Sequence, residues 1–171
     1  MRPASHSISM AACTCGLVVA LAVALVMAAC RPQEPFSEYQ AVDAHGWSST
    51  DTLRFDLPRQ ELPAAYGVML GVRHTEAYPY TELWVALEQR TAGRHGTTAR
   101  RDTIHLLLAN AAGQWLTPHP TLHTCEQPAA TIRLTPDSAV QLLVYHLMPR
   151  QLLEGITDIG LTLTPAHQHQ P

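Results

Sequence analysis

The sequence predicts an all-β domain, an antiparallel β-sandwich of jelly-roll type with about seven to eight strands. Apolar and polar residues alternate at a period of two in several stretches after residue 46, which is the pattern of strands with one buried face. Prolines and glycine-containing polar loops fall between these stretches or at their margins, where no ladder hydrogen bond is needed. Short strands at regular spacing are typical of a sandwich, in which each sheet buries its alternate residues against the other.

The clearest alternation is in residues 53–57, where Leu53, Phe55 and Leu57 would face a core and the residues between them would face water. This stretch is therefore predicted as the first strand. Six further strands are predicted at residues 66–72, 83–87, 104–108, 131–134, 140–147 and 159–163.

The segments between the expected strands carry turn signals. Residues 91–96 and 110–113 are polar and contain glycine, so they are predicted to be hairpin loops. Residues 149–155 alone have a helical character, which predicts a single helical turn. Gly155 and Gly160 are expected to serve turns or bulges, because glycine tolerates backbone conformations that other residues avoid.

The first thirty residues have the features of a bacterial lipoprotein signal. Arg2 supplies a positive charge, residues 11–29 are predominantly apolar, and Ala28 and Ala29 place small residues before Cys30. In such signals the cysteine thiol receives a lipid, so Cys30 is the predicted lipidation site, with palmitate among the expected acyl groups. The alternative is a retained single-pass helix, since the apolar stretch is close to the roughly 20 residues that span a bilayer.

Composition limits the possible functions of the part after the signal. All 14 acidic residues follow Cys30, whereas one of the 11 cationic residues precedes it, so no basic surface for nucleic acid is predicted. Cys13 and Cys15 would be removed with the signal, which leaves Cys125 without an internal disulfide partner. The predicted organisation is as follows: a signal peptide at 1–29, a lipidated tether at 30–46, a β-sandwich at 47–165 and a disordered tail at 166–171.

Histidine and cysteine residues provide a weak candidate metal site. His119, His123 and Cys125 have a spacing that could bind zinc, but a surface loop is the commoner explanation for three such residues in one loop. His105 and His146 lie within expected strands and are predicted to be rim or outward-facing residues. No nucleophile elbow, zinc-protease helix or dinucleotide fingerprint is present, so neither an enzymatic role nor a cofactor is predicted.

Aromatic residues suggest a surface for protein partners. Tyr78 and Tyr80 flank a proline and would lie near a sheet edge, while Trp84 would point away from the inward residues of its strand. The alternative is that Trp84 covers the second face of a central strand, because strand aromatics commonly pack. Trp47 and Trp115 are predicted to be core residues.

Three segments together resemble the gliding-motility lipoprotein family GldH of the Bacteroidetes: residues 78–84 (YPYTELW), residues 102–116 and residues 153–160 (LEGITDIG). The resemblance extends over most of the chain after Cys30. It implies a non-catalytic lipoprotein of the cell envelope that assists the gliding apparatus and type IX secretion. We expect an outer-membrane anchor facing the periplasm. The alternative function is a carbohydrate- or ligand-binding jelly-roll lipoprotein.

Overall fold

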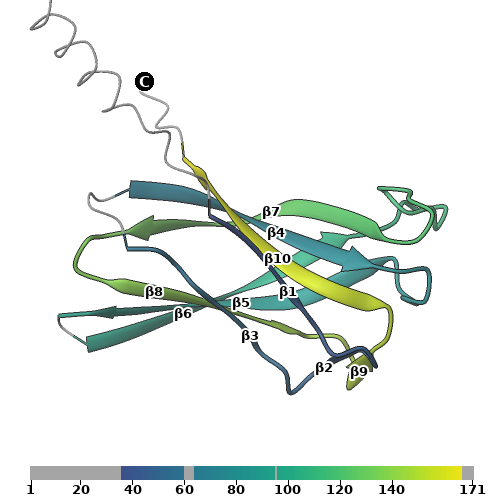
Figure 1. Ribbon diagram of the computed structural model, residues 1–171, viewed down its shortest axis with the longest axis horizontal. Helices are drawn as coiled ribbons and strands as arrows, with labels where there is room; N and C mark the ends of the chain where they lie inside the picture. Colours follow the sequence, from purple (N-terminus) through teal and green to yellow (C-terminus); the bar gives the residue numbers. More distant parts are fainter. Residues whose placement is uncertain (1–35, 60–63, 95, 167–171) are drawn as a thin grey trace, which may run out of the picture. The chain divides into compact units, whose positions relative to one another are not determined.

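The alternating stretches form strands in the computed structural model, which describes residues 36–59, 64–94 and 96–166 (Figure 1). Within these residues, ten strands follow in chain order: β1 (Ser37–Ala41), β2 (Trp47–Ser48), β3 (Leu53–Asp56), β4 (Ala64–His74), β5 (Glu82–Gly93), β6 (Gly96–Leu107), β7 (His123–Leu134), β8 (Ala139–His146), β9 (Leu152–Leu153) and β10 (Ile156–Pro165). No helix long and apolar enough to span a membrane occurs in this part of the chain.

The eight longer strands form two antiparallel sheets of four. One sheet, here called sheet A, has the order β1-β10-β4-β7, and the other, sheet C, has the order β3-β8-β5-β6. Apart from the β5–β6 hairpin within sheet C, successive long strands pass from one sheet to the other, and the resulting strand orders are those of a jelly roll. The two sheets form the layers visible in Figure 1. The predicted fold class is confirmed.

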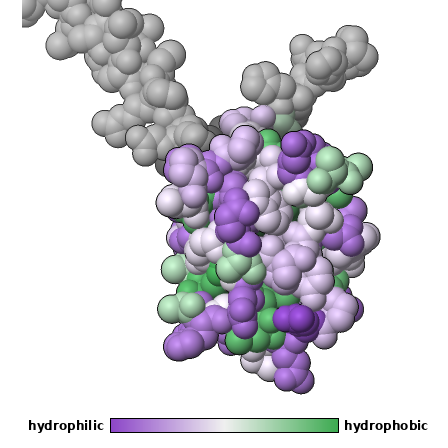
Figure 2. Space-filling model, turned by 90° about the vertical axis from the view of Figure 1, so that its right-hand side faces the viewer, coloured by the Kyte–Doolittle hydropathy of each residue, from purple (hydrophilic) through white to green (hydrophobic). Residues whose placement is uncertain are grey.

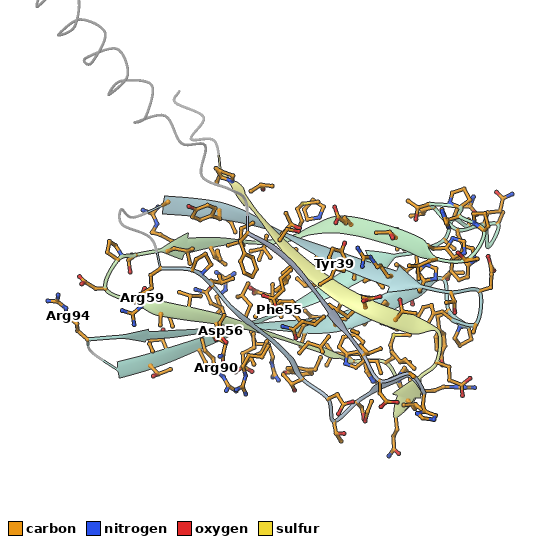
Figure 3. All side chains as sticks on the ribbon, viewed as in Figure 1. Tyr39, Phe55, Asp56, Arg59, Arg90 and Arg94 are labelled. Atoms are coloured by element: carbon orange, nitrogen blue, oxygen red, sulfur yellow. The ribbon has the colours of Figure 1, made fainter. Side chains whose placement is uncertain are left out.

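The inward residues of both sheets make one hydrophobic core. Phe55, Leu70, Leu83, Leu142 and Leu161 are each 0% exposed and come from β3, β4, β5, β8 and β10. Figure 3 shows Phe55 between the two layers. Each buried side chain of this size contributes roughly 1.5–3 kcal/mol relative to leaving it in water, so this core is a main source of the domain's stability.

The strands extend beyond the stretches that alternate most clearly. Residues 37–41, predicted as tether, form β1 and pair with β10 in sheet A. The predicted helical turn at 149–155 is wrong, because its residues 152–153 form β9 beside β2. β7 is twelve residues long and contains Pro128, which was expected outside a strand. Pro128 is tolerated there because β7 is an edge strand with a bulge beside it.

The Tyr39 ring covers part of the outer face of sheet A. Tyr39 lies opposite Gly160, which lies opposite Gly71 on the next strand. A Cβ atom at Gly160 would come within 2.5 Å of the Tyr39 ring, and one at Gly71 would strike the Tyr39 hydroxyl. The prediction of a turn or bulge at Gly160 is wrong: the residue makes room for Tyr39. Gly155 has φ = 84° in the β9–β10 turn, as predicted.

Tyr39 thereby reaches across three neighbouring strands. Its hydroxyl donates a 2.6 Å hydrogen bond to Glu126 Oε1 on β7, and the Arg73 guanidinium lies 3.9 Å from its ring centroid. Burial and the Glu126 carboxylate raise the pKa of Tyr39, because both disfavour the phenolate. The ring therefore ties both edge strands of sheet A to its centre (Figure 3).

The two ends of the sandwich differ. At one end the described termini meet, with the Leu163 amide donating to the Phe36 carbonyl and the Ala166 amide to the Ala65 carbonyl. Arg59 and Arg94 also lie toward this end in Figure 3. The opposite end carries the four connections formed by residues 42–52, 75–81, 108–122 and 147–155. We call it the loop end.

Candidate functional site

The loop end gathers polar and aromatic side chains from segments far apart in the sequence. Figure 2 views this end and shows hydrophobic groups exposed between hydrophilic ones. β4 ends there at His74 and β7 begins there at His123, which are opposite each other in the sheet. Because alternate connections of an antiparallel sandwich share one end, the 75–81 and 108–122 loops meet above this pair.

Three rings pack together in this region: the two histidine rings are stacked, and Trp115 lies edge-on to His74 and tilted against His123. The His74 and His123 side chains are 0% and 2% exposed, and their ring centroids lie 5.0 Å apart. Trp115, half-buried, has its ring centroid 4.5 Å from that of His74 and 5.4 Å from that of His123. Burial lowers the pKa of His74 because it disfavours the charged imidazolium.

Glu76 bridges two of these rings. One carboxylate oxygen accepts a 2.8 Å hydrogen bond from Trp115 Nε1, and the other lies 2.8 Å from His123 Nε2. The hydrogen bonds from Trp115 and then His123 lower the pKa of Glu76, because they favour its charged form. His123 Nδ1 lies 3.0 Å from the Thr117 carbonyl oxygen, so this ring also contacts the second half of the 108–122 loop.

An open cleft of about 620 Å³ lies beside this cluster. Its lining consists of these residues: Glu76, Asn110, Gln114, Trp115, Pro118, His119, Pro120 and His123. The combination of one aromatic ring with several convergent polar groups is typical of small-molecule sites, and the volume is within their usual range.

The structure does not bring the three candidate metal ligands, His119, His123 and Cys125, together around one point. His123 faces Glu76 and the Thr117 carbonyl, Cys125 is buried with its thiol 3.4 Å from the Leu107 carbonyl oxygen, and His119 is exposed. No group of three or more His, Cys, Asp or Glu side chains in the described ranges is arranged to hold a metal ion. The grouping of these three residues as ligands is therefore wrong.

The predicted partner-binding aromatics separate into different environments. Tyr78 is 2% exposed, and its hydroxyl donates to the Glu82 carbonyl over 2.9 Å, so it belongs to the core and cannot form a surface contact. Tyr80 is half-buried and packs edge-on against Tyr78. Trp84 is 38% exposed and points outward, as predicted.

Trp84 lies within an apolar group on the outer face of sheet C. Its ring stacks on His105 with centroids 4.1 Å apart, and His105 Nε2 lies 2.6 Å from Glu82 Oε2. Leu107 and Leu147, 50% and 44% exposed, lie close by in the sheet register. We call Trp84, His105, Leu107 and Leu147 the Trp84 patch.

Of the remaining predictions for aromatic and histidine residues, some are confirmed and others are wrong. Trp47 is a core residue as predicted, whereas Trp115 is only half-buried. His105 faces outward as predicted, but His146 is 3% exposed. The prediction of a rim or outward position for His146 is wrong, because His146 pairs with the inward-facing Val85 and packs edge-on against Trp47.

Sequence reasoning missed Glu76, Asn110 and Gln114 as parts of one cleft. Glu76 lies in a short polar turn and Gln114 in a glycine-containing loop, where neither has a periodic pattern around it. The signal that could have found them is topological. In a jelly roll, the 75–81 and 108–122 connections must lie at the same end of the sandwich.

The structure does not test the predicted lipidation site, because Cys30 and the rest of the predicted signal lie outside the described residues.

Comparison with known proteins identifies the family of the chain. The model of the GldH lipoprotein family matches residues 34–163, more than half of the 171-residue chain. No curated protein matches the chain. Because the matched region includes the loop end and all but the last two residues of the sheets, the chain belongs to the GldH lipoprotein family.

Proposed function

We propose that this protein is a lipid-anchored, non-catalytic component that assists assembly or operation of the gliding and type IX secretion machinery of the cell envelope. The observation that carries the proposal is the GldH lipoprotein match over residues 34–163. A lipoprotein family implies association with a membrane, and the exposed Trp84 patch offers a surface for a protein partner.

The proposed anchor is Cys30. Phe36, the first described residue, follows it by six positions, so an extended connection would span roughly 20 Å at most. Phe36 lies at the end of the sandwich opposite the loops. An anchor at Cys30 would thus hold the terminal end near the bilayer and leave the loop end accessible to partners.

We place the anchor in the outer membrane, with the domain facing the periplasm. The residues after Cys30 read Arg-Pro-Gln-Glu, with one acidic side chain among the four. This stretch does not resemble an acidic signal for export to the cell surface, which favours the periplasmic leaflet.

Palmitate labelling tests the anchor. We expect the native protein to incorporate labelled palmitate and to sediment with membranes, and Cys30→Ala to lose both properties. Cys125→Ala is the matched control, because Cys125 is buried in the sandwich. Unlabelled native protein, or labelled Cys30→Ala protein, would contradict the anchor.

Cross-linking in intact envelopes tests the partner. We expect components of the gliding or secretion machinery to be recovered with the native protein, and Trp84→Ala to lose them, because a partially exposed tryptophan is a common energetic centre of an interface. Leu152→Ala is the control, since Leu152 is 41% exposed and lies on β9, outside the Trp84 patch. Equal recovery with both variants would exclude this patch as the docking surface.

A further inference from the structure

We infer that the loop-end cleft is a binding site for a neutral saccharide of one or two pyranose rings. This goes beyond the proposed assembly role and does not depend on the Trp84 patch. The inference begins with the cleft's size, about 620 Å³, and with its position between the 75–81 and 108–122 loops. A volume of several hundred Å³ is within the usual range of small-ligand sites, and the open cleft leaves one side of a bound ligand in solvent.

Trp115 provides a rigid aromatic surface for the ligand. Its indole nitrogen is bonded to Glu76, and its ring packs against the buried His74 ring at 4.5 Å and the His123 ring at 5.4 Å. Trp115 also forms an antiparallel bridge with Ala109. A pyranose ring has one face of C–H groups that packs on such a surface, and a ring already held in place loses little conformational freedom on binding.

Hydrogen bonds also hold the loop that carries Trp115 in place. The Asn110 amide donates to the Gln114 carbonyl over 2.8 Å, and Asn110 Oδ1 accepts hydrogen bonds from the Ala112 and Gln114 amides. At its far side, Thr117 Oγ1 donates to the Thr124 carbonyl over 2.6 Å. The site is therefore formed before a ligand arrives.

Planar polar groups surround the ring, as hydroxyl recognition requires. Asn110 Nδ2 donates to Gln114 Oε1 over 3.0 Å, which fixes the Gln114 side chain and leaves its amide hydrogens without a partner in the described part of the chain. Each Glu76 oxygen receives one bond from Trp115 or His123 and has capacity for another. Gln114 can thus donate to sugar hydroxyls, and Glu76 can accept from them.

The charges in the cleft favour a neutral ligand. The lining contains no arginine, and its one carboxylate, Glu76, opposes an anion such as phosphate. Glu76 is at the same time engaged by Trp115 and His123, which weakens its attraction for a cation. A molecule with an apolar face and a hydroxylated rim matches these groups better than either ion.

Saturation-transfer NMR on the full-length protein tests the inference. The protein is kept in a detergent without a sugar headgroup, and the probes are glucose, galactose, mannose, N-acetylglucosamine, maltose and cellobiose at millimolar concentration. We expect at least one probe to receive saturation, and Trp115→Ala to weaken its binding roughly tenfold or more. Gln114→Ala, which keeps the ring, is expected to weaken binding severalfold.

Trp84→Ala is the matched control, because it removes an exposed tryptophan outside the cleft and should leave sugar binding unchanged. If Trp115→Ala does not fold, Trp115→Phe and Gln114→Ala carry the test. Silence from all six probes, or binding that persists when Trp115 is removed, overturns the inference. Binding of a polyproline peptide in place of any sugar also overturns it, since the cleft would then be a peptide site. None of these outcomes depends on the partner experiment above.

Discussion

The outer faces of the two sheets use aromatic rings in opposite ways. On sheet A, Tyr39 lies flat across Gly160 and Gly71 and bonds Glu126, so one ring connects four strands. On sheet C, Trp84 stacks on one neighbouring side chain, His105, and remains 38% exposed. The neighbouring residues explain the difference. Two glycines allow the Tyr39 ring to lie flat on sheet A, whereas the His105 side chain, opposite Trp84 in the sheet register, holds the Trp84 ring upright on sheet C.

This contrast predicts that stability and binding separate between the faces. Substitutions around Tyr39 should change the free energy of unfolding, and substitutions at Trp84 should change partner recovery with little effect on unfolding.

Gly160→Ala should have the largest effect. Its new Cβ atom would come within 2.5 Å of the Tyr39 ring, which would have to move and lose its contacts with Glu126 and Arg73. We expect a loss of about 2–3 kcal/mol in the free energy of unfolding, measured by urea denaturation. Gly93→Ala is the control, because nothing lies within 4 Å of its Cβ position and its φ is not positive. Equal stability of both variants would show that Tyr39 does not need the glycine.

Tyr39→Phe should have a smaller effect that depends on pH. It removes the 2.6 Å hydrogen bond to Glu126 but keeps the ring, so we expect a loss of about 1 kcal/mol near neutral pH. The pKa of Tyr39 is raised in the folded state, so the unfolded chain loses its proton first and the native protein should lose stability as pH rises above about 10. Tyr39→Phe should reduce this alkaline loss. It should not abolish it, since burial also raises the pKa of Tyr78. An unchanged alkaline profile would contradict this account.

Gly160 and Tyr39 also show what a sequence can and cannot predict. The period-two pattern identified the inward residues of β3, β4, β5 and the second half of β6, because alternation directly reports which side chains are buried. It could not explain Gly160, whose role depends on a residue more than a hundred positions earlier in the chain. β1 was missed for a related reason: its burial pattern is intermediate in the middle and does not alternate.

The loop-end cleft was beyond prediction for a different reason. His123 and Cys125 do share the inward face of β7, as their spacing suggests. The partner that engages His123 is Glu76, from a turn 47 residues away. Only the strand order brings Glu76 and His123 together, and this order cannot be read from spacing within one loop. The spacing therefore suggested a metal site, whereas the fold forms a carboxylate–histidine–tryptophan cluster.

Trp84→Ala should change the free energy of unfolding by less than about 1 kcal/mol, because a partly exposed strand residue loses few buried contacts. Urea denaturation beside the cross-linking experiment measures both properties on one variant. A loss as large as that of Gly160→Ala would mean that Trp84 is a packing residue, which would remove the contrast between the two faces.

The smallest expected effect is a local acid transition in the Trp84 patch. Hydrogen bonds from the side chains of His105 and then Trp84 lower the pKa of Glu82 below its ordinary value of 4.5. The carboxylate therefore stabilises the folded state above pH 4.5, and that contribution is lost as pH falls through the lowered pKa. The fluorescence difference between the native protein and Trp84→Phe should change in this acid range, and Glu82→Gln should remove the change. If the transition survives in Glu82→Gln, the stacking of Trp84 on His105 is independent of the carboxylate, and the ring is held upright by its neighbour alone.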